Sequence, residues 1–475
     1  MMCSSRMRYA RGAAVLLLVL LGTASALYAE DPPAAADPSK PTFKFGLSAG
    51  FSTMAISNSH FGRGLLWPLP TPEIPLDSYK TDVTRTELYI APKLDMTWDL
   101  QSRGTVFGGI RGVFSKTEGD GDTWNLTADS PNHGDLDQLF VGWRSKPAAG
   151  KPAWELSYGH QDFQLSDGMV LVDGDNETSK AIYWGDPRKA WENAAIAKVD
   201  YSKMHLEVFS LNADGDYYAD GAGNPLGGNL GDSIQGANIE YRDQALGRFG
   251  LSRFRISDSD FPTRQGMSVT AVNGRIRPIK TKPTFEVAAE YDWQRNPGHD
   301  IEADAWFAEG TYTIIRPWYP TFGYRYSSFS GDNAATSRNE GWDSLHNGFT
   351  PRGFGYWYQG LVVGTYESLL TNLDTHFFHV TVAPPMVPGA WIKLLYYDHS
   401  FNDKSTAGMF PVGGAAVSSN AFAKELDFVV GFSASPKFDI IAAYATASPG
   451  QGGRDRSQGF GKDESLVQFT VLFHY

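Results

Sequence analysis

Apolar and polar residues alternate through most of the chain with the two-residue period of β-strands. In the clearest stretch, residues 83–100, one set of alternate positions is mostly apolar and the other polar: Thr86, Leu88, Ile90, Pro92, Leu94, Met96 and Trp98 against Arg85, Glu87, Tyr89, Lys93, Asp95 and Thr97. Successive side chains of a strand point to opposite faces. The pattern therefore predicts strands with one apolar wall and one polar wall.

The last ten residues, 466–475, make this prediction more specific. Val467, Phe469, Val471, Phe473 and Tyr475 share one face, and Gln468, Thr470 and His474 lie on the other. An exposed apolar edge strand invites aggregation in a soluble protein. In a bacterial outer-membrane barrel the last strand instead pairs with the first, and its outer face meets lipid. We therefore predict an all-β, antiparallel up-and-down transmembrane barrel.

We expect about eighteen strands, an even number being usual in single-chain bacterial barrels. The candidate stretches are 43–52, 83–100, 105–116, 136–146, 154–161, 193–201, 203–212, 233–243, 246–257, 267–275, 285–294, 303–315, 320–330, 354–366, 375–383, 390–401, 425–432, 438–444 and 466–475. Short links predict periplasmic turns. Longer polar links predict external loops at 62–81, 164–189, 214–232, 331–352 and 403–420. A barrel of this size encloses an aqueous lumen.

The N-terminus predicts export. Arg6, Arg8 and Arg11 precede a short apolar run and the small residues 24–26, which is the pattern of a signal peptide. Cleavage after Ala29 is the other candidate. We assign residues 1–29 to the signal peptide, 30–42 to a flexible periplasmic leader and 43–475 to the barrel. The single cysteine, Cys3, leaves with the signal, so disulfides and thiolate metal sites are excluded.

Composition supports a barrel in the outer membrane of a bacterium. Aromatic residues make up 13% of the chain, glycine contributes 50 residues, and mean hydropathy is −0.31. Aromatic rings suit strands and interfacial girdles. The formal charge of −12 argues against non-specific binding of nucleic acid. The expected partners are outer-membrane lipid and the barrel-assembly machinery, and we expect a monomer.

Basic residues at inward phase are the candidate selectivity residues. They come from strands around the circumference: Arg85, Lys93, Arg111, Arg144, Arg242, Arg325 and Lys393. Guanidinium groups at a water-filled constriction favour anions and bind carboxylates through paired hydrogen bonds. The alternative is that each cation balances a wall carboxylate such as Glu87, Glu240 or Glu425.

Several segments resemble the alginate-export porin family of eighteen-stranded outer-membrane barrels. They are residues 138–143, 156–161, 166–168, 324–326, 355–360 and 424–430. The resemblance implies passive export of an anionic exopolysaccharide through a positively charged lumen, with a periplasmic export complex as a further partner. The matched segment Gly159, His160 and Gln161 has histidine where the family has arginine, and Asp137 replaces another arginine. Both changes weaken the case for alginate.

Four functions therefore compete, one of which is a secreted soluble β protein that binds or cleaves polysaccharide; the other three are channels or an enzyme of the outer membrane. The first is export of an alginate-like anionic polysaccharide. The alternative is an uptake porin for small organic anions or oligosaccharides. An outer-membrane enzyme, which would need a nucleophile with a positioned base, is less favoured, because no motif joins residues such as Ser157 and His160. We therefore predict a channel without catalytic residues.

The remaining candidate chemistry is calcium binding in an external loop. Asp173, Asp175 and Glu177 alternate with small and polar residues, and alternating carboxylates can supply oxygen ligands to calcium. The full twelve-residue calcium loop is missing, and Asp-Gly is also ordinary turn chemistry. We otherwise expect no cofactor.

Overall fold

The computed structural model describes residues 40–64, 80–124, 127, 131–175, 181–182, 185, 187–216, 229–279, 284–348, 354–355, 359–368, 370–407 and 416–475. The signal peptide and most of the leader lie outside these residues, so both stay predictions. Within the described residues no helix has the length and apolar character needed to cross a bilayer.

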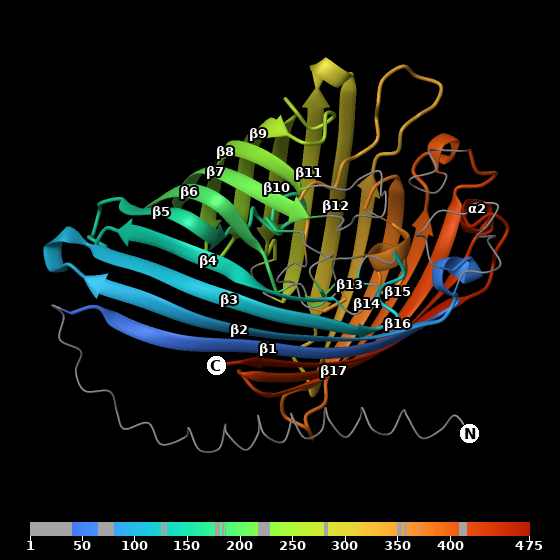
Figure 1. The fold of residues 1–475 in the computed structure, drawn as a ribbon, viewed down its shortest axis with the longest axis horizontal. Coiled ribbons are helices and arrows are strands. Elements are labelled where there is room, and N and C mark those ends of the chain that lie inside the picture. The colour runs from blue at the N-terminus through green and yellow to red at the C-terminus, as the bar shows by residue number, and fades with distance from the viewer. Residues whose placement is uncertain are drawn as a thin grey trace.

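The described chain forms one closed sheet of eighteen antiparallel strands (Figure 1). They are β1 (Thr42–Ser57), β2 (Val83–Asp99), β3 (Thr105–Gly119), β4 (Asn132–Arg144), β5 (Ala153–Asp162), β6 (Ala190–Tyr201), β7 (Met204–Asp216), β8 (Asn229–Asp243), β9 (Gly247–Ser259), β10 (Ser268–Ile276), β11 (Phe285–Asn296), β12 (Ile301–Thr313), β13 (Trp318–Phe329), β14 (Leu373–Ala383), β15 (Ala390–Ser400), β16 (Ala421–Ser435), β17 (Phe438–Pro449) and β18 (Glu464–His474).

Each strand pairs with its neighbours in the sequence, and β18 pairs with β1 to close the barrel, with Ser52 opposite Thr470. The short helix α2 (Gln451–Arg456) lies in the connection between β17 and β18. The predicted all-β up-and-down barrel is therefore confirmed, and so is the pairing of the last strand with the first. Closure satisfies the backbone groups that an open edge would leave unpaired in lipid.

One predicted strand is wrong. Described residues of the stretch 354–366 form turns that lead into η7 (Val363–Glu367), a single π-helical turn. Gly360 has a φ of +108°, which interrupts extended structure. The run Leu361-Val362-Val363 is apolar because both of its sides are buried inside the barrel. Periodicity alone cannot distinguish such a run from a buried strand.

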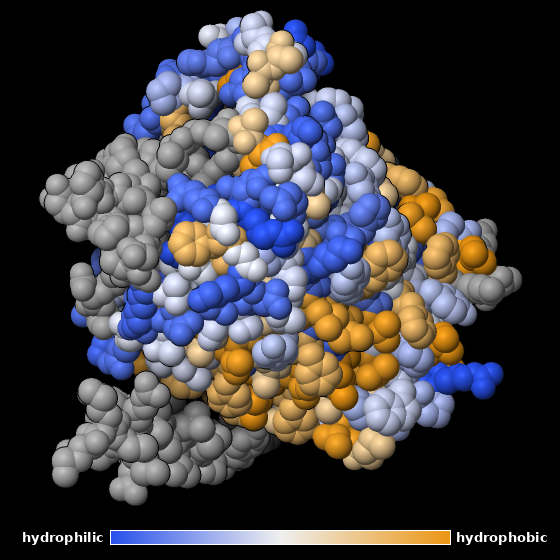
Figure 2. All heavy atoms as spheres, turned by 90° about the vertical axis from the view of Figure 1, so that its right-hand side faces the viewer, coloured by the Kyte–Doolittle hydropathy of each residue, from blue (hydrophilic) through white to orange (hydrophobic). Residues whose placement is uncertain are grey.

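The outer face of the barrel carries an apolar belt. Figure 2 shows hydrophobic side chains gathered below a more hydrophilic region of the surface. The predicted alternation is confirmed on β2, where Ile90, Leu94 and Trp98 are exposed and Arg85 and Glu87 are buried. The belt includes Phe45, Ile110, Leu139, Val141, Leu206, Val208, Leu251, Val272, Phe378, Leu394, Phe428, Val467 and Phe469. Such a surface is suited to lipid.

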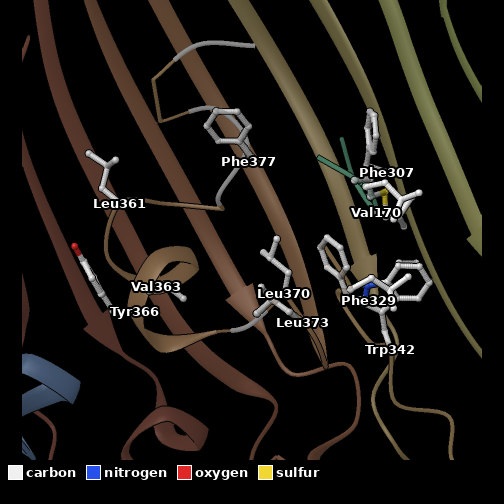
Figure 3. Close-up of a cluster of buried hydrophobic side chains, with 14 of the residues drawn as sticks. Val170, Phe307, Phe329, Trp342, Leu361, Val363, Tyr366, Leu370, Leu373 and Phe377 are labelled. Carbon is white, nitrogen blue, oxygen red and sulfur yellow. The ribbon is translucent and has the colours of Figure 1, made fainter. Parts of the chain in front are cut away.

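The interior differs from the open aqueous lumen that we predicted. Residues 59–64, 163–175, 342–347 and 359–368, here called the inward-folded segments, pack against the inner wall. Figure 3 shows Val170 next to the wall residue Phe307, and Trp342 next to the wall residue Phe329. Phe61, Val170 and Val363 are fully buried. Much of the interior at the loop end is therefore a packed core.

Candidate functional site in the barrel interior

Three of the predicted selectivity residues are buried inside the barrel. Arg85, Arg325 and Lys393 are 3%, 0% and 7% exposed. Arg85 donates a hydrogen bond of 2.7 Å to the Tyr366 hydroxyl and pairs with Glu87 at 3.0 Å. The Arg325 guanidinium lies 4.8 Å from the centre of the Phe377 ring. These cations contact protein groups rather than open solvent.

Lys393 also contacts protein groups. Its ammonium group donates a hydrogen bond to the carbonyl of Phe354 at 3.0 Å. The ammonium also lies 4.6 Å from the centre of the Trp391 ring. A cation over an aromatic face is stabilised by the ring quadrupole. The inward phase predicted for Lys393 is therefore consistent with the structure, while its surroundings are those of a packing contact.

Wall carboxylates hold the segment that contains η7. Glu425 on β16 accepts hydrogen bonds from the backbone N–H groups of Val362 and Val363, each at 2.7 Å. A Cβ atom at Gly360 would lie 2.4 Å from a Glu425 oxygen, so glycine is needed for this close approach. Each of the two Glu425 oxygens accepts one of these N–H groups, so both oxygens hold the segment. Glu425 thus anchors the segment to the wall.

A second anchor joins residues 342–347 to β8. Arg264 donates to Asp343 at 2.7 and 2.8 Å and to Asp232 at 2.9 Å. His346 contacts the same Asp232 carboxylate at 2.7 Å. Burial raises the pKa of Asp343, but the Arg264 guanidinium and the Leu345 N–H outweigh it and lower that pKa overall. The ionised carboxylate therefore fixes this segment.

The other predicted cations are more accessible, and each has a contact of its own. Arg111 pairs with Asp137 and, at 2.9 Å, with Asp162. Lys93 pairs with Asp95 on the same strand, β2, at 3.1 Å. Arg144 is exposed at the end of β4, over the ring of Phe107.

The opposite wall holds a row of three arginines on consecutive strands. Arg242 on β8 lies directly across from Arg248 on β9, and Arg248 lies across from Arg275 on β10. Their side chains are 50%, 29% and 32% exposed. These strands are green to yellow-green in Figure 1. Like charges in directly opposite positions destabilise a sheet, so the row favours nearby anions.

A polar cavity of about 370 Å³ lies beside this arginine row. Lys198, His205, Arg242 and Arg248 contribute basic groups to its lining, and Ser166 comes from an inward-folded segment. The acidic lining residues are Glu155, Asp200, Glu207 and Glu240. Glu240 bonds to Arg242 at 2.7 Å, and Lys198 lies 3.4 Å from Glu207. Because a guanidinium has five N–H donors, such contacts leave further donors for a solute.

A protein carboxylate already lies between two arginines of the row. Asp167, in the inward-folded segment 163–175, pairs with Arg248 through one oxygen and with Arg275 through the other, the latter at 2.7 Å. Arg275 also contacts Glu286 at 3.2 Å. Asp167 therefore shows that a carboxylate can bridge neighbouring arginines of this wall.

Arg248 and Arg275 are absent from the sequence-predicted set, although alternation could have identified both. Phe249 and Leu251 are exposed on the outer face. Arg248 directly precedes Phe249, so its side chain points to the inner face. Val272 is outward on β10, which places Arg275 at inward phase. Their proximity is a property of strand register, which the sequence pattern does not give.

The segment matched to the alginate-export family has structural contacts. Gly159 has a φ of +128°, and a Cβ there would lie 2.3 Å from the Leu139 carbonyl oxygen. His160 contacts Glu192 at 3.2 Å. The Gln161 side chain donates to the Ala194 carbonyl at 2.9 Å and is buried. Glycine and glutamine at these positions therefore serve the sheet itself.

Two of the three residues predicted to bind calcium, Asp173 and Asp175, lie in the described part of the chain. Asp173 is buried, and its carboxylate accepts a 3.2 Å hydrogen bond from the Asp175 N–H, which is ordinary turn chemistry. Glu177 lies outside the described residues. Within the described part of the chain, no group of three or more potential metal ligands comes together.

Neither the family models nor the curated proteins contain a match to this chain. Solved structures do resemble it. OccK5 (OpdH) of Pseudomonas aeruginosa is 12% identical over 90% of this chain and 97% of its own, with a TM-score of 0.51. OpdK of the same organism, solved with vanillate, is 12% identical over 91% and 98%, with a TM-score of 0.50.

OccAB4 of Acinetobacter baumannii is 11% identical over 92% of this chain and all of its own, also with a TM-score of 0.50. At these identities the likeness concerns the fold. OpdK is an outer-membrane protein, so the barrel type found here is one used in that membrane. Its closed eighteen-stranded sheet and the apolar belt on the outer face give this chain the architecture of a membrane-spanning barrel.

Proposed function

We propose that the protein is a passive channel for the uptake of small organic anions, with Arg242, Arg248 and Arg275 as the groups that select them. The observation that carries the proposal is the arginine row beside an open polar cavity. Guanidinium groups on a pore wall lower the energy of an anion relative to a cation. Their fork of donors also suits a carboxylate.

Cavity size supports a small solute. About 370 Å³ lies within the ordinary range for sites that bind small molecules. Export of an alginate-like polysaccharide, the main prediction from sequence, needs a continuous path for a polymer. The inward-folded segments occupy much of the interior at the loop end, where Phe61, Val170 and Val363 are buried. This packing favours uptake of small anions over polymer export.

Asp167 gives the proposal a mechanism. Its carboxylate bridges Arg248 and Arg275 as a carboxylate of a solute would. An entering anion replaces the Asp167 carboxylate and water at the arginines, and Asp167 can then displace the anion again. The anion therefore passes through the channel without binding too tightly to leave. Transport through a pore requires binding that is favourable and also readily reversible.

The experiment compares solutes of matched size in liposomes that contain the purified barrel. Vanillate and its neutral analogue vanillyl alcohol differ in a single carboxylate. We expect faster permeation of vanillate, because its carboxylate binds the arginine row. Equal permeation of the two would overturn anion selectivity. Current block by short polyuronate chains, without vanillate permeation, would favour polysaccharide export instead.

A further inference from the structure

The outer face of β9 changes from apolar to basic partway along the strand. Phe249 and Leu251 are exposed in the apolar belt, and the next two outward residues are Arg253 and Arg255. Phe254 lies between the two arginines in sequence and is buried on the inner side. Because strand side chains alternate, both guanidinium groups project from the outer wall.

Strand register places these arginines at the border of the apolar belt. Arg253 lies across from Thr270 of β10, and Thr270 lies across from Trp293 of β11. The Trp293 and Tyr291 rings are in contact, with centroids 4.4 Å apart. Aromatic side chains gather where lipid tails meet head groups. Arg253 is therefore level with the interface, and Arg255 lies one step nearer the long loops.

The residues directly across from the two arginines on the neighbouring strands are uncharged. On β8 their cross-strand neighbours are Ala237 and Gln235, and on β10 they are Thr270 and Ser268. Within the described residues, no carboxylate forms an ion pair with Arg253 or Arg255. By contrast, Arg295, the next outward arginine at the level of Arg255, pairs with Glu302 at 2.7 Å. A charge at a lipid border is costly unless it has a partner.

We propose that Arg253 and Arg255 bind the phosphate groups of a phosphorylated glycolipid in the outer leaflet. The acyl chains of this lipid would lie along Leu251 and Val272, which neighbour each other across β9 and β10 and are both exposed. Paired guanidinium groups match phosphate oxygens in charge and hydrogen-bond geometry. The leaflet follows from the direction of β9, whose arginine end is the end of the long loops. This site is separate from the arginine row inside the barrel.

The test measures lipid binding to the detergent-purified barrel by native mass spectrometry. The probes are bisphosphorylated lipid A, lipid A without its phosphates, and phosphatidylglycerol. We expect R253Q/R255Q to weaken binding of bisphosphorylated lipid A about tenfold or more, since two charge-assisted contacts are lost. The control R103Q/K151Q removes the same charge from exposed positions in the turns at the opposite end and should bind as the wild type does.

Three outcomes decide the proposal. A tenfold loss confined to R253Q/R255Q and to the phosphorylated lipid supports it. Equal binding of bisphosphorylated lipid A by wild type and R253Q/R255Q overturns it. Equal affinity of the wild type for phosphatidylglycerol and bisphosphorylated lipid A overturns the assignment to a glycolipid. Retained heat-modifiable migration of R253Q/R255Q in detergent gels establishes that the variant is folded.

Discussion

The inner walls of β13–β16 and of β8–β10 are built from similar residues, yet their charges have different surroundings. Arg325 is 0% exposed next to Gln359 of the segment that carries η7, and Lys393 is 7% exposed next to Phe354. Arg242 and Arg275, on the other wall, have side chains that are 50% and 32% exposed. In Figure 1 the first wall is orange and the second green to yellow-green.

The contrast teaches that inward phase does not by itself make a charged residue part of a pore. On the covered wall, charges bind loops: Glu425 accepts the N–H groups of Val362 and Val363. On the open wall, three arginines stay near water, with Asp167 bridging two of them. Charged side chains therefore anchor a loop on one side and, in the function proposed above, bind solutes on the other.

The largest effect is expected from neutralising the open wall. In R242Q/R248Q/R275Q the attraction for carboxylates is lost, so the vanillate permeability relative to vanillyl alcohol should fall about tenfold. The measurement is liposome permeation, with reversal potentials in planar bilayers as a second reading. R103Q/K151Q serves as a control at the turns. Unchanged selectivity in the triple variant would remove the role of this wall.

A smaller effect is expected on the covered wall. E425L leaves the N–H groups of Val362 and Val363 without their acceptor, at a cost of about 1–3 kcal/mol for each buried group. The segment with η7 should detach more often, raising single-channel conductance and its fluctuations. E425Q keeps one acceptor oxygen and should lie between the wild type and E425L. If conductance and noise stay at the wild-type level in E425L, Glu425 does not anchor the segment.

The smallest effect is expected from D167N, which removes the charge that competes for Arg248 and Arg275. The amide keeps a hydrogen-bond acceptor, so the segment should stay in place, while anions should bind about two- to threefold more tightly, since roughly half a kcal/mol of competition is relieved. The measurement is the concentration at which vanillate blocks half of the single-channel current. Weaker block in D167N than in the wild type would contradict the proposed exchange.

The sequence predicts the barrel better than it predicts the interior. Alternation in residues 83–100 and at the C-terminus fixes which face meets lipid, because period-two patterning is local. It also assigns Arg85 to the inner face correctly. It cannot reveal that Tyr366, 281 residues away in the chain, covers that guanidinium. Burial of this kind arises from tertiary packing.

The arginine row illustrates a second limit. Arg242 is among the predicted residues, and the phase of Arg248 is readable from Phe249 and Leu251. What makes them a site is that Arg248 lies opposite both Arg242 and Arg275. Register depends on turns and bulges, such as the irregularity between Ser233 and Ile234 in the pairing of β8 with β9.

The most direct test of the contrast between the walls is thiol accessibility. Cys3 is the sole cysteine and lies in the predicted signal peptide, so R248C and R325C each introduce one thiol into the mature barrel. A small, negatively charged methanethiosulfonate reagent is added to each folded variant, and the modification rate is measured. The account predicts rapid modification of R248C and little or none of R325C. Equal rates at the two positions would contradict it.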